Sequence, residues 1–95
     1  FFMKVVYTYH AKNKFANEKY VFDLKITKTL VQKTILNPDY ENRTRGEKVT
    51  ALVQIDPAHL LLVVYKRISG GIIKVITFYP IRSGGKYESK ILQER

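Results

Sequence analysis

Residues 60–82 have the sequence LLLVVYKRISGGIIKVITFYPIR, which predicts two apolar β-strands joined by a tight turn at Ser69-Gly70-Gly71. The first strand, 60–66, is apolar on both faces, as is typical of a strand in the middle of a sheet. The second strand, 72–79, is followed by Pro80, which is expected to end the pairing because proline has no backbone N–H. This hairpin is therefore expected to form the centre of the fold.

A third strand is predicted at 48–55, directly before the hairpin. Its apolar residues recur at every second position, which is the period of a half-buried strand (Val49, Ala51, Val53 and Ile55). The following Asp56-Pro57-Ala58-His59 fits a type I turn, with Asp in the first position and Pro in the second. Strands 48–55, 60–66 and 72–79 are therefore expected to form an antiparallel meander.

The first part of the chain predicts a strand at 3–9, rich in β-branched and aromatic residues, and a helix at 10–19. Within that helix Ala11 and Phe15 lie four residues apart, which places them on one face. Segment 20–26 is either a connector or an extension of this helix.

A second helix is expected to begin near Lys28, because Thr27 is a good N-cap and apolar residues occupy the two staple positions around it. The helix should end at Asn37-Pro38, since the residue before proline avoids helical backbone angles. The polar segment 39–47 is expected to be a loop that turns at Gly46.

These elements predict an α+β fold: an N-terminal strand, two helices, then a three-stranded antiparallel meander, with the helices packed on one face of the sheet. Residues 3–90 are expected to form a single domain, with 91–95 as a tail. Phe1 and Phe2 precede Met3, the expected natural start, and are expected to be a remnant of cloning.

The composition is strongly basic, with 17 Lys and Arg against 8 Asp and Glu and a net charge of +9. Such a charge attracts nucleic acid or an acidic protein, whereas the alternative is a lysine-rich solvated surface. Cysteine is absent, and no apolar run approaches the ~20 residues of a membrane helix. We therefore expect a cytoplasmic protein without membrane contact.

Several kinds of site lack the residues that they need. Two histidines in unrelated contexts, without cysteine or spaced acids, do not form a metal-ligand set, and no cofactor is expected. The glycine turn lies between strands, whereas a phosphate-binding P-loop opens a helix. Acids are too few for glycoside hydrolysis.

Metal-independent RNA cleavage does suit the composition. In this reaction the 2′-hydroxyl attacks the neighbouring phosphate, so the site needs a proton acceptor, a proton donor and cations. His, Tyr, Lys and Arg supply all of these groups. Between Pro57 and Tyr87 the chain has five basic residues and no acid.

His10 is the main candidate for proton transfer, because imidazole exchanges a proton near neutral pH and His10 lies where a strand is followed by a helix. The alternative is a junction histidine that bonds the backbone. For His59, after a tight turn, the structural role is favoured. Arg82 could bind phosphate and Tyr79 could stack on a base or donate a proton, although both could instead be edge residues. The residues expected to contact nucleic acid are Lys12, Lys14, Tyr65, Arg67, Lys86 and Tyr87.

Several segments resemble a group of small uncharacterised prokaryotic domains: Tyr9-His10-Ala11 with Phe15, Asn37-Pro38, residues 59–65, and residues 75–82. Those domains are grouped with the RelE/BrnT-like, barnase–colicin-like ribonuclease folds, which include toxins of toxin–antitoxin pairs. The resemblance implies a compact α+β toxin-like fold, RNA as substrate and an acidic antitoxin as partner. It also places His10, Tyr79 and Arg82 at the catalytic positions.

The leading hypothesis is therefore a toxin-type endoribonuclease that needs no metal. A module that binds nucleic acid without catalysis is the second hypothesis, and it predicts affinity that falls steeply with salt. A module that binds an acidic partner protein is the third.

Overall fold

The structure is a computed structural model that describes residues 4–43 and 48–85. The elements in chain order are β1 (Lys4–Tyr7), α1 (Tyr9–Asn17), α2 (Lys19–Asp23), α3 (Lys28–Leu36), β2 (Tyr40–Arg43), β3 (Lys48–Asp56), β4 (His59–Ser69) and β5 (Ile72–Arg82). Within the described ranges the strands form one five-stranded sheet, in the order β1-β5-β4-β3-β2. The expectations for Phe1, Phe2, Gly46, Lys86, Tyr87 and the tail 91–95 lie outside these ranges.

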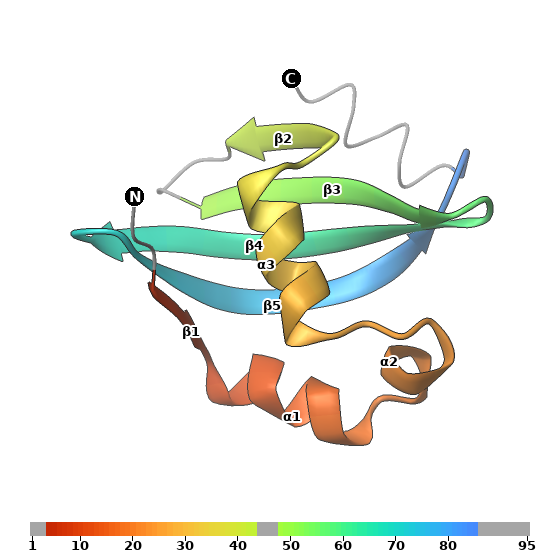
Figure 1. Cartoon of the computed structure of the whole chain (residues 1–95), viewed down its shortest axis with the longest axis horizontal. Coiled ribbons are helices and arrows are strands. Elements are labelled where there is room, and N and C mark those ends of the chain that lie inside the picture. Colours follow the sequence, from red (N-terminus) through yellow and green to blue (C-terminus); the bar gives the residue numbers. More distant parts are fainter. Residues whose placement is uncertain (1–3, 44–47, 86–95) are drawn as a thin grey trace.

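The predicted α+β class is confirmed, with an N-terminal strand, then helices, then antiparallel strands. Helix α3 crosses the sheet diagonally, while α1 and α2 run along the side where β5 lies (Figure 1). All three helices contribute to the same core as β3, β4 and β5. None of the described helices is long and apolar enough to cross a membrane.

The central hairpin is longer than its sequence predicts. Gly70 and Gly71 both have positive φ angles, 50° and 84°, which a tight turn between twisted strands favours. Pairing of β4 with β5 extends from Ser69↔Ile72 to His59↔Arg82. The hairpin therefore carries its two terminal residues, His59 and Arg82, side by side at its open end.

The expectation that Pro80 ends this pairing is wrong, because Pro80 lies opposite Leu61 and the strand continues to Arg82. The carbonyl of Phe78 points to the outer edge of β5, where it accepts a hydrogen bond from Lys14 Nζ at 2.8 Å. Along a strand the backbone N–H and C=O groups of every second residue point to the same edge. The nitrogen of Pro80, two residues after Phe78, therefore faces the same outer edge. Within the described part of the chain no neighbouring strand requires an N–H there, since β1 pairs with residues 72–75.

Two features of the sheet differ from the predicted meander. Strand β1 pairs in parallel with β5, from Lys4↔Ile72 to Tyr7↔Val75. The segment expected to be a polar loop contains β2, which pairs antiparallel with β3 from Tyr40↔Leu52 to Arg43↔Val49. The polar sequence of β2 suits an edge strand, which has a partner on one side only.

The helix boundaries follow their caps. Thr27 Oγ1 accepts from the backbone N–H of Leu30 at 3.1 Å, as predicted, and α3 ends before Asn37. Thr8 caps α1 in the same way through Ala11 N, at 3.1 Å. Segment 20–26 is neither a plain connector nor an extension of α1, because it contains the separate short helix α2.

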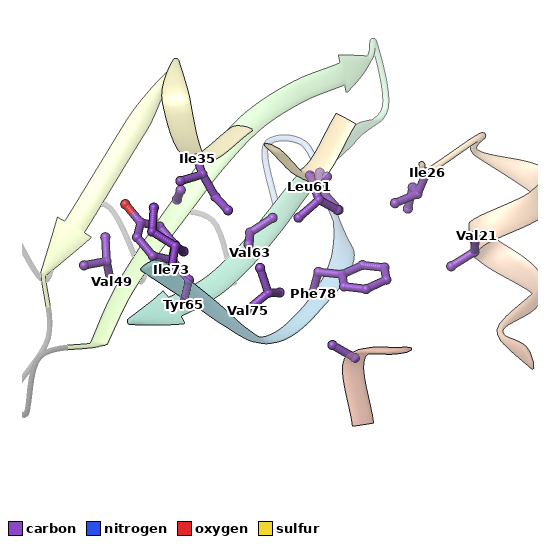
Figure 2. Packing of buried hydrophobic residues seen from close by; sticks show 13 residues of the cluster. Val21, Ile26, Ile35, Val49, Leu61, Val63, Tyr65, Ile73, Val75 and Phe78 are labelled. Atoms are coloured by element: carbon purple, nitrogen blue, oxygen red, sulfur yellow. The ribbon is translucent and has the colours of Figure 1, made fainter. Parts of the chain in front are cut away.

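The sheet is apolar on both faces, which explains the continuous apolar run in β4. Leu61, Val63 and Tyr65 face the helices, and Figure 2 shows them among buried side chains of β3, β5 and the helices. Leu60 and Leu62 lie in a second buried cluster with Leu52 and Ile81. Successive residues of β4 therefore alternate between two buried clusters.

Candidate functional site

A groove of about 500 Å³ lies beside α2 and the paired ends of β4 and β5. Its lining combines one ammonium group, one carboxylate, an imidazole, a phenol and two apolar side chains: Lys19, Tyr20, Asp23, Leu24, His59 and Pro80. Helix α2 supplies the first three of these, and the open end of the hairpin supplies His59 and Pro80. Groups able to transfer protons and to bind an anion are therefore gathered where the hairpin strands end.

His59 is oriented by Asp56, which lies three residues earlier in the turn between β3 and β4. Its Nδ1 lies 3.0 Å from Asp56 Oδ1 and 3.1 Å from Oδ2. The backbone N–H of Ala58 donates to Asp56 Oδ1 at 2.8 Å and is the main cause that lowers the pKa of Asp56, with a further contribution from His59. An ionised Asp56 favours a proton on Nδ1, so the neutral ring presents Nε2 as an acceptor.

The turn that carries this pair is fixed by hydrogen bonds from β3 itself and from the residue that follows β5. Ser83 N, after β5, donates to the carbonyl of Ala58 at 2.9 Å. Gln54 Nε2, from β3, donates to the carbonyl of Asp56 at 2.7 Å and to Ser83 Oγ at 3.3 Å. The position of His59 is thus set by the backbone at the ends of three strands.

Arg82 lies next to His59. The two residues are register partners in β4 and β5, and partners in an antiparallel pair point to the same face of the sheet. The Arg82 side chain is exposed. A guanidinium can therefore reach an anion bound beside the imidazole, with two hydrogen bonds in a fixed plane.

Tyr79 lies on the other face of the sheet from Arg82. It packs against the cluster of Leu62 and Ile81, and residues three apart in a regularly paired strand point to opposite faces. His10 is exposed in the first turn of α1 and is not among the residues that line the groove. The structure therefore places Arg82 beside the groove residue His59 but does not bring His10, Tyr79 and Arg82 together.

Lys14 lies at the outer edge of β5 instead of at a phosphate position. In addition to its bond to the Phe78 carbonyl, its Nζ lies 5.2 Å from the ring centre of Tyr79 and 5.9 Å from that of Tyr20. Burial lowers the pKa of Lys14, and nearby Glu18 partly opposes this effect. Burial and Glu18 both raise the pKa of Tyr20, which keeps this groove phenol protonated at neutral pH.

The remaining predicted contacts with nucleic acid are dispersed. Tyr65 is fully buried, and its hydroxyl donates to Glu41 Oε2 at 3.1 Å, so its predicted contact with nucleic acid is corrected to a role in the core. Arg67 is exposed near the glycine turn, eight residues from His59 along β4, or roughly 26 Å. Lys12 is exposed on α1.

Sequence reasoning missed His59, Asp56, Lys19 and Tyr20 as parts of one site. The local signal was present, since Asp-Pro-Ala-His in a tight turn brings the carboxylate of its first residue to the imidazole of its last. Lys19 and Tyr20 had no such signal, because their place in the groove depends on how α2 packs against the hairpin.

No protein-family model and no curated protein sequence matches the chain. Its structure is similar to the crystal structure of the Brucella abortus ribonuclease toxin BrnT, with a TM-score of 0.58 and 14% sequence identity. The match covers 84% of this chain and 97% of the BrnT chain. At this identity the similarity concerns the fold alone, and it agrees with the resemblance noted in the sequence. The chain therefore shares its fold with the Brucella abortus ribonuclease toxin BrnT.

Proposed function

We propose that the chain is a metal-independent endoribonuclease of the toxin–antitoxin type, with its active site in the groove at the open end of the hairpin. The observation that carries this proposal is His59, held at 3.0 Å by Asp56, directly across the strand pair from Arg82. A base with a fixed orientation beside a guanidinium is the arrangement that cleavage by an internal 2′-hydroxyl requires. The fold shared with BrnT supports the same reaction class.

In the proposed reaction His59 Nε2 takes the proton of the RNA 2′-hydroxyl as its oxygen attacks the adjacent phosphorus. A bond forms between phosphorus and O2′, and the bond between phosphorus and O5′ breaks. The leaving O5′ takes a proton from Tyr20, the protonated phenol of the groove. The products are a 2′,3′-cyclic phosphate and a 5′-hydroxyl, and Arg82 binds the phosphate oxygens during the reaction.

This assignment differs from the sequence-based one in the identity of the base. His59, unlike His10, has both an orienting carboxylate and a place in the groove. Tyr79 lies on the face opposite Arg82, so it is proposed only as a ring on which an RNA base could stack.

The test is cleavage of cellular RNA in EDTA by the purified protein and its variants. His59→Gln and Arg82→Ala should each lower the cleavage rate by about 100-fold, while His10→Gln, the matched histidine control, should change it by less than about threefold. Fragments should end in a cyclic phosphate. Loss in His10→Gln with normal activity in His59→Gln would move the site to α1.

Absence of cleavage by the wild-type chain would favour the second candidate function, binding of nucleic acid without catalysis. The net charge of +9 favours this alternative. Its signature is affinity for RNA that falls linearly with salt on logarithmic axes and does not depend on His59.

A further inference from the structure

The turn that closes the β4–β5 hairpin forms a small cleft of about 270 Å³, and this turn lies at the opposite end of the hairpin from α2 (Figure 1). The cleft is lined by groups that donate hydrogen bonds and by one aliphatic side chain: Arg67, Ser69, Gly70, Gly71 and Ile72. No carboxylate is among them. The proposed cleavage of RNA uses none of these residues, because the groove that contains His59 lies at the other end of the strands.

The backbone of the turn supplies two of these donors. Gly70 and Gly71 have φ angles of 50° and 84°, and because they carry no side chain their backbone itself forms the surface of the cleft. Among the described residues, neither of their N–H groups donates a hydrogen bond. Successive N–H groups in a turn form a concave site for an anion. Because this turn joins two strands, its donors act without the helix dipole of a P-loop.

The cleft is held in shape by β1 and by an irregularity in β4. The backbone N–H of Lys4 donates to the carbonyl of Gly71 at 3.0 Å, which anchors the turn to the edge strand. In β4, Arg67 lies opposite Ile73 and Ser69 lies opposite Ile72, so one extra residue forms a β-bulge between Arg67 and Ser69. A bulge re-aims the side chains beside it, and both of these residues line the cleft. The donors are therefore placed before a ligand binds, which lowers the entropy cost of binding.

Positive charge is concentrated around the cleft. Lys66 and Lys74 are register partners in β4 and β5, directly beside the pair of Arg67 and Ile73. Like charges placed opposite each other destabilise a sheet. Their field adds to that of Arg67 within the distance of about 8 Å over which charges act at physiological salt. An anion bound in the cleft would offset this repulsion.

We propose that this cleft binds a phosphate monoester, supplied by the 5′ end of a nucleic acid or by a free nucleotide. The Arg67 guanidinium binds a phosphate through two hydrogen bonds, and the Ser69 hydroxyl and the two N–H groups of the turn supply three more. A terminal phosphate offers three oxygens and a charge of about −1.5 to −2, whereas a phosphate inside a nucleic-acid chain offers two oxygens and a single charge. The number of donors therefore favours the terminal group.

The test is an NMR titration of the whole protein at physiological salt with 5′-AMP and with adenosine, which lacks the phosphate. The amide signals of Gly70 and Gly71 should shift with 5′-AMP and stay unchanged with adenosine. Arg67→Ala should weaken the binding of 5′-AMP at least about tenfold, because both guanidinium hydrogen bonds are lost. Lys33→Ala removes the same charge from an exposed residue outside the cleft and should change the affinity by less than about threefold.

Two DNA oligonucleotides of the same sequence, one with a 5′-phosphate and one with a 5′-hydroxyl, identify the source of the phosphate. Both lack the 2′-hydroxyl, so the proposed cleavage reaction cannot act on them. If the phosphorylated oligonucleotide binds more tightly than both 5′-AMP and its 5′-hydroxyl match, the cleft takes the end of a nucleic acid. If it binds no more tightly than 5′-AMP, the cleft takes a free nucleotide.

Three results would overturn the proposal. The first is that 5′-AMP leaves the signals of Gly70 and Gly71 unchanged or shifts only those near His59. The second is that adenosine shifts the same signals as 5′-AMP. The third is an equal loss of affinity in Arg67→Ala and Lys33→Ala, which would indicate attraction by net charge alone. None of these measurements depends on cleavage of RNA, so the outcome is independent of the proposed function.

Discussion

The two ends of the β4–β5 hairpin are built from similar residue types but differ in what fixes their side chains. At the closed end, beside Gly70 and Gly71, Arg67 lines a cleft of about 270 Å³. Nearby, Lys66 and Lys74 lie directly opposite each other, a repulsive arrangement of like charges. At the open end, His59 and Arg82 lie side by side, and Asp56 orients the imidazole.

The comparison distinguishes residues that attract RNA by their charge from residues that could catalyse its cleavage. The cations at the closed end draw a polyanion towards the protein, because their field acts over about 8 Å at physiological salt. The open end adds an oriented proton acceptor, which is what a reaction requires. The density of positive charge in the hairpin therefore does not locate the candidate active site, whereas the hydrogen bond to His59 does.

The largest expected effect is on stability, from shortening a core side chain that lies between the two ends of the hairpin. Phe78 is fully buried and packs at 4.6 Å from Phe15 of α1, so Phe78→Ala should lower the free energy of unfolding by about 3–5 kcal/mol. Ile68→Ala, at a half-exposed residue of the closed end, should cost less than about 1 kcal/mol. Urea titrations would measure both, and equal losses would contradict the common core.

The sharpest test of the comparison itself replaces one arginine at each end. Arg82→Ala should lower the rate of RNA cleavage by about 100-fold, because it removes the phosphate contact beside His59. Arg67→Ala should leave that rate within about threefold and reduce the salt slope of RNA binding by about one. If the two variants lose activity equally, the open end has no special role.

The turn at the closed end gives a smaller effect. Gly70 has φ 50° and open space around its Cα, so Gly70→Ala meets backbone strain without a clash. We expect a loss of about 1 kcal/mol in the free energy of unfolding, with unchanged RNA cleavage. Ser69→Ala is the control and should change stability by less than about 0.5 kcal/mol. A Gly70→Ala protein as stable as the wild type would show that the turn adopts another conformation.

The smallest effect concerns acid stability at the open end. The pKa of Asp56 is lowered from its ordinary value of 3.8, so its stabilising contribution is present above that pH and is lost as the pH falls through the lower, folded value. Asp56→Asn should therefore lose less stability than the wild type between about pH 5 and pH 2. His59→Gln should keep most of the wild-type dependence, because the main cause is the N–H of Ala58. Identical curves for Asp56→Asn and the wild type would refute the assignment.

Much of the fold follows from local sequence signals. The Thr27 cap, the glycine turn and the period-two pattern of 48–55 depend on residues close in the chain, and each predicts its element correctly. Pro80 and β2 were misjudged because their outcome depends on neighbours: Pro80 is tolerated since it faces an outer edge, and β2 exists since β3 offers it a partner.

The candidate site was predictable only in part. Arg82 was singled out because the end of a basic hairpin is a local feature; the structure places it beside His59, and its role in catalysis stays a prediction. His59 was assigned a structural role, although its Asp56 partner is three residues away. Tyr20 lines the groove because of how α2 packs, and Tyr65 is buried because the helices cover it. Neither outcome can be predicted from the residues next to it in the sequence.

The pairing of β1 with β5 has a consequence for the order of folding. Thr8 and Ile76, which are hydrogen-bonded, are 68 residues apart, so β1 cannot find its partner until almost the whole sheet has left the ribosome. At ordinary translation speeds the delay is roughly 3 to 14 s. Strands β3 and β4 can meanwhile pair with each other. During this interval β1 has been made but its partner β5 has not, so β1 is open to pairing with other strands in the newly made chain.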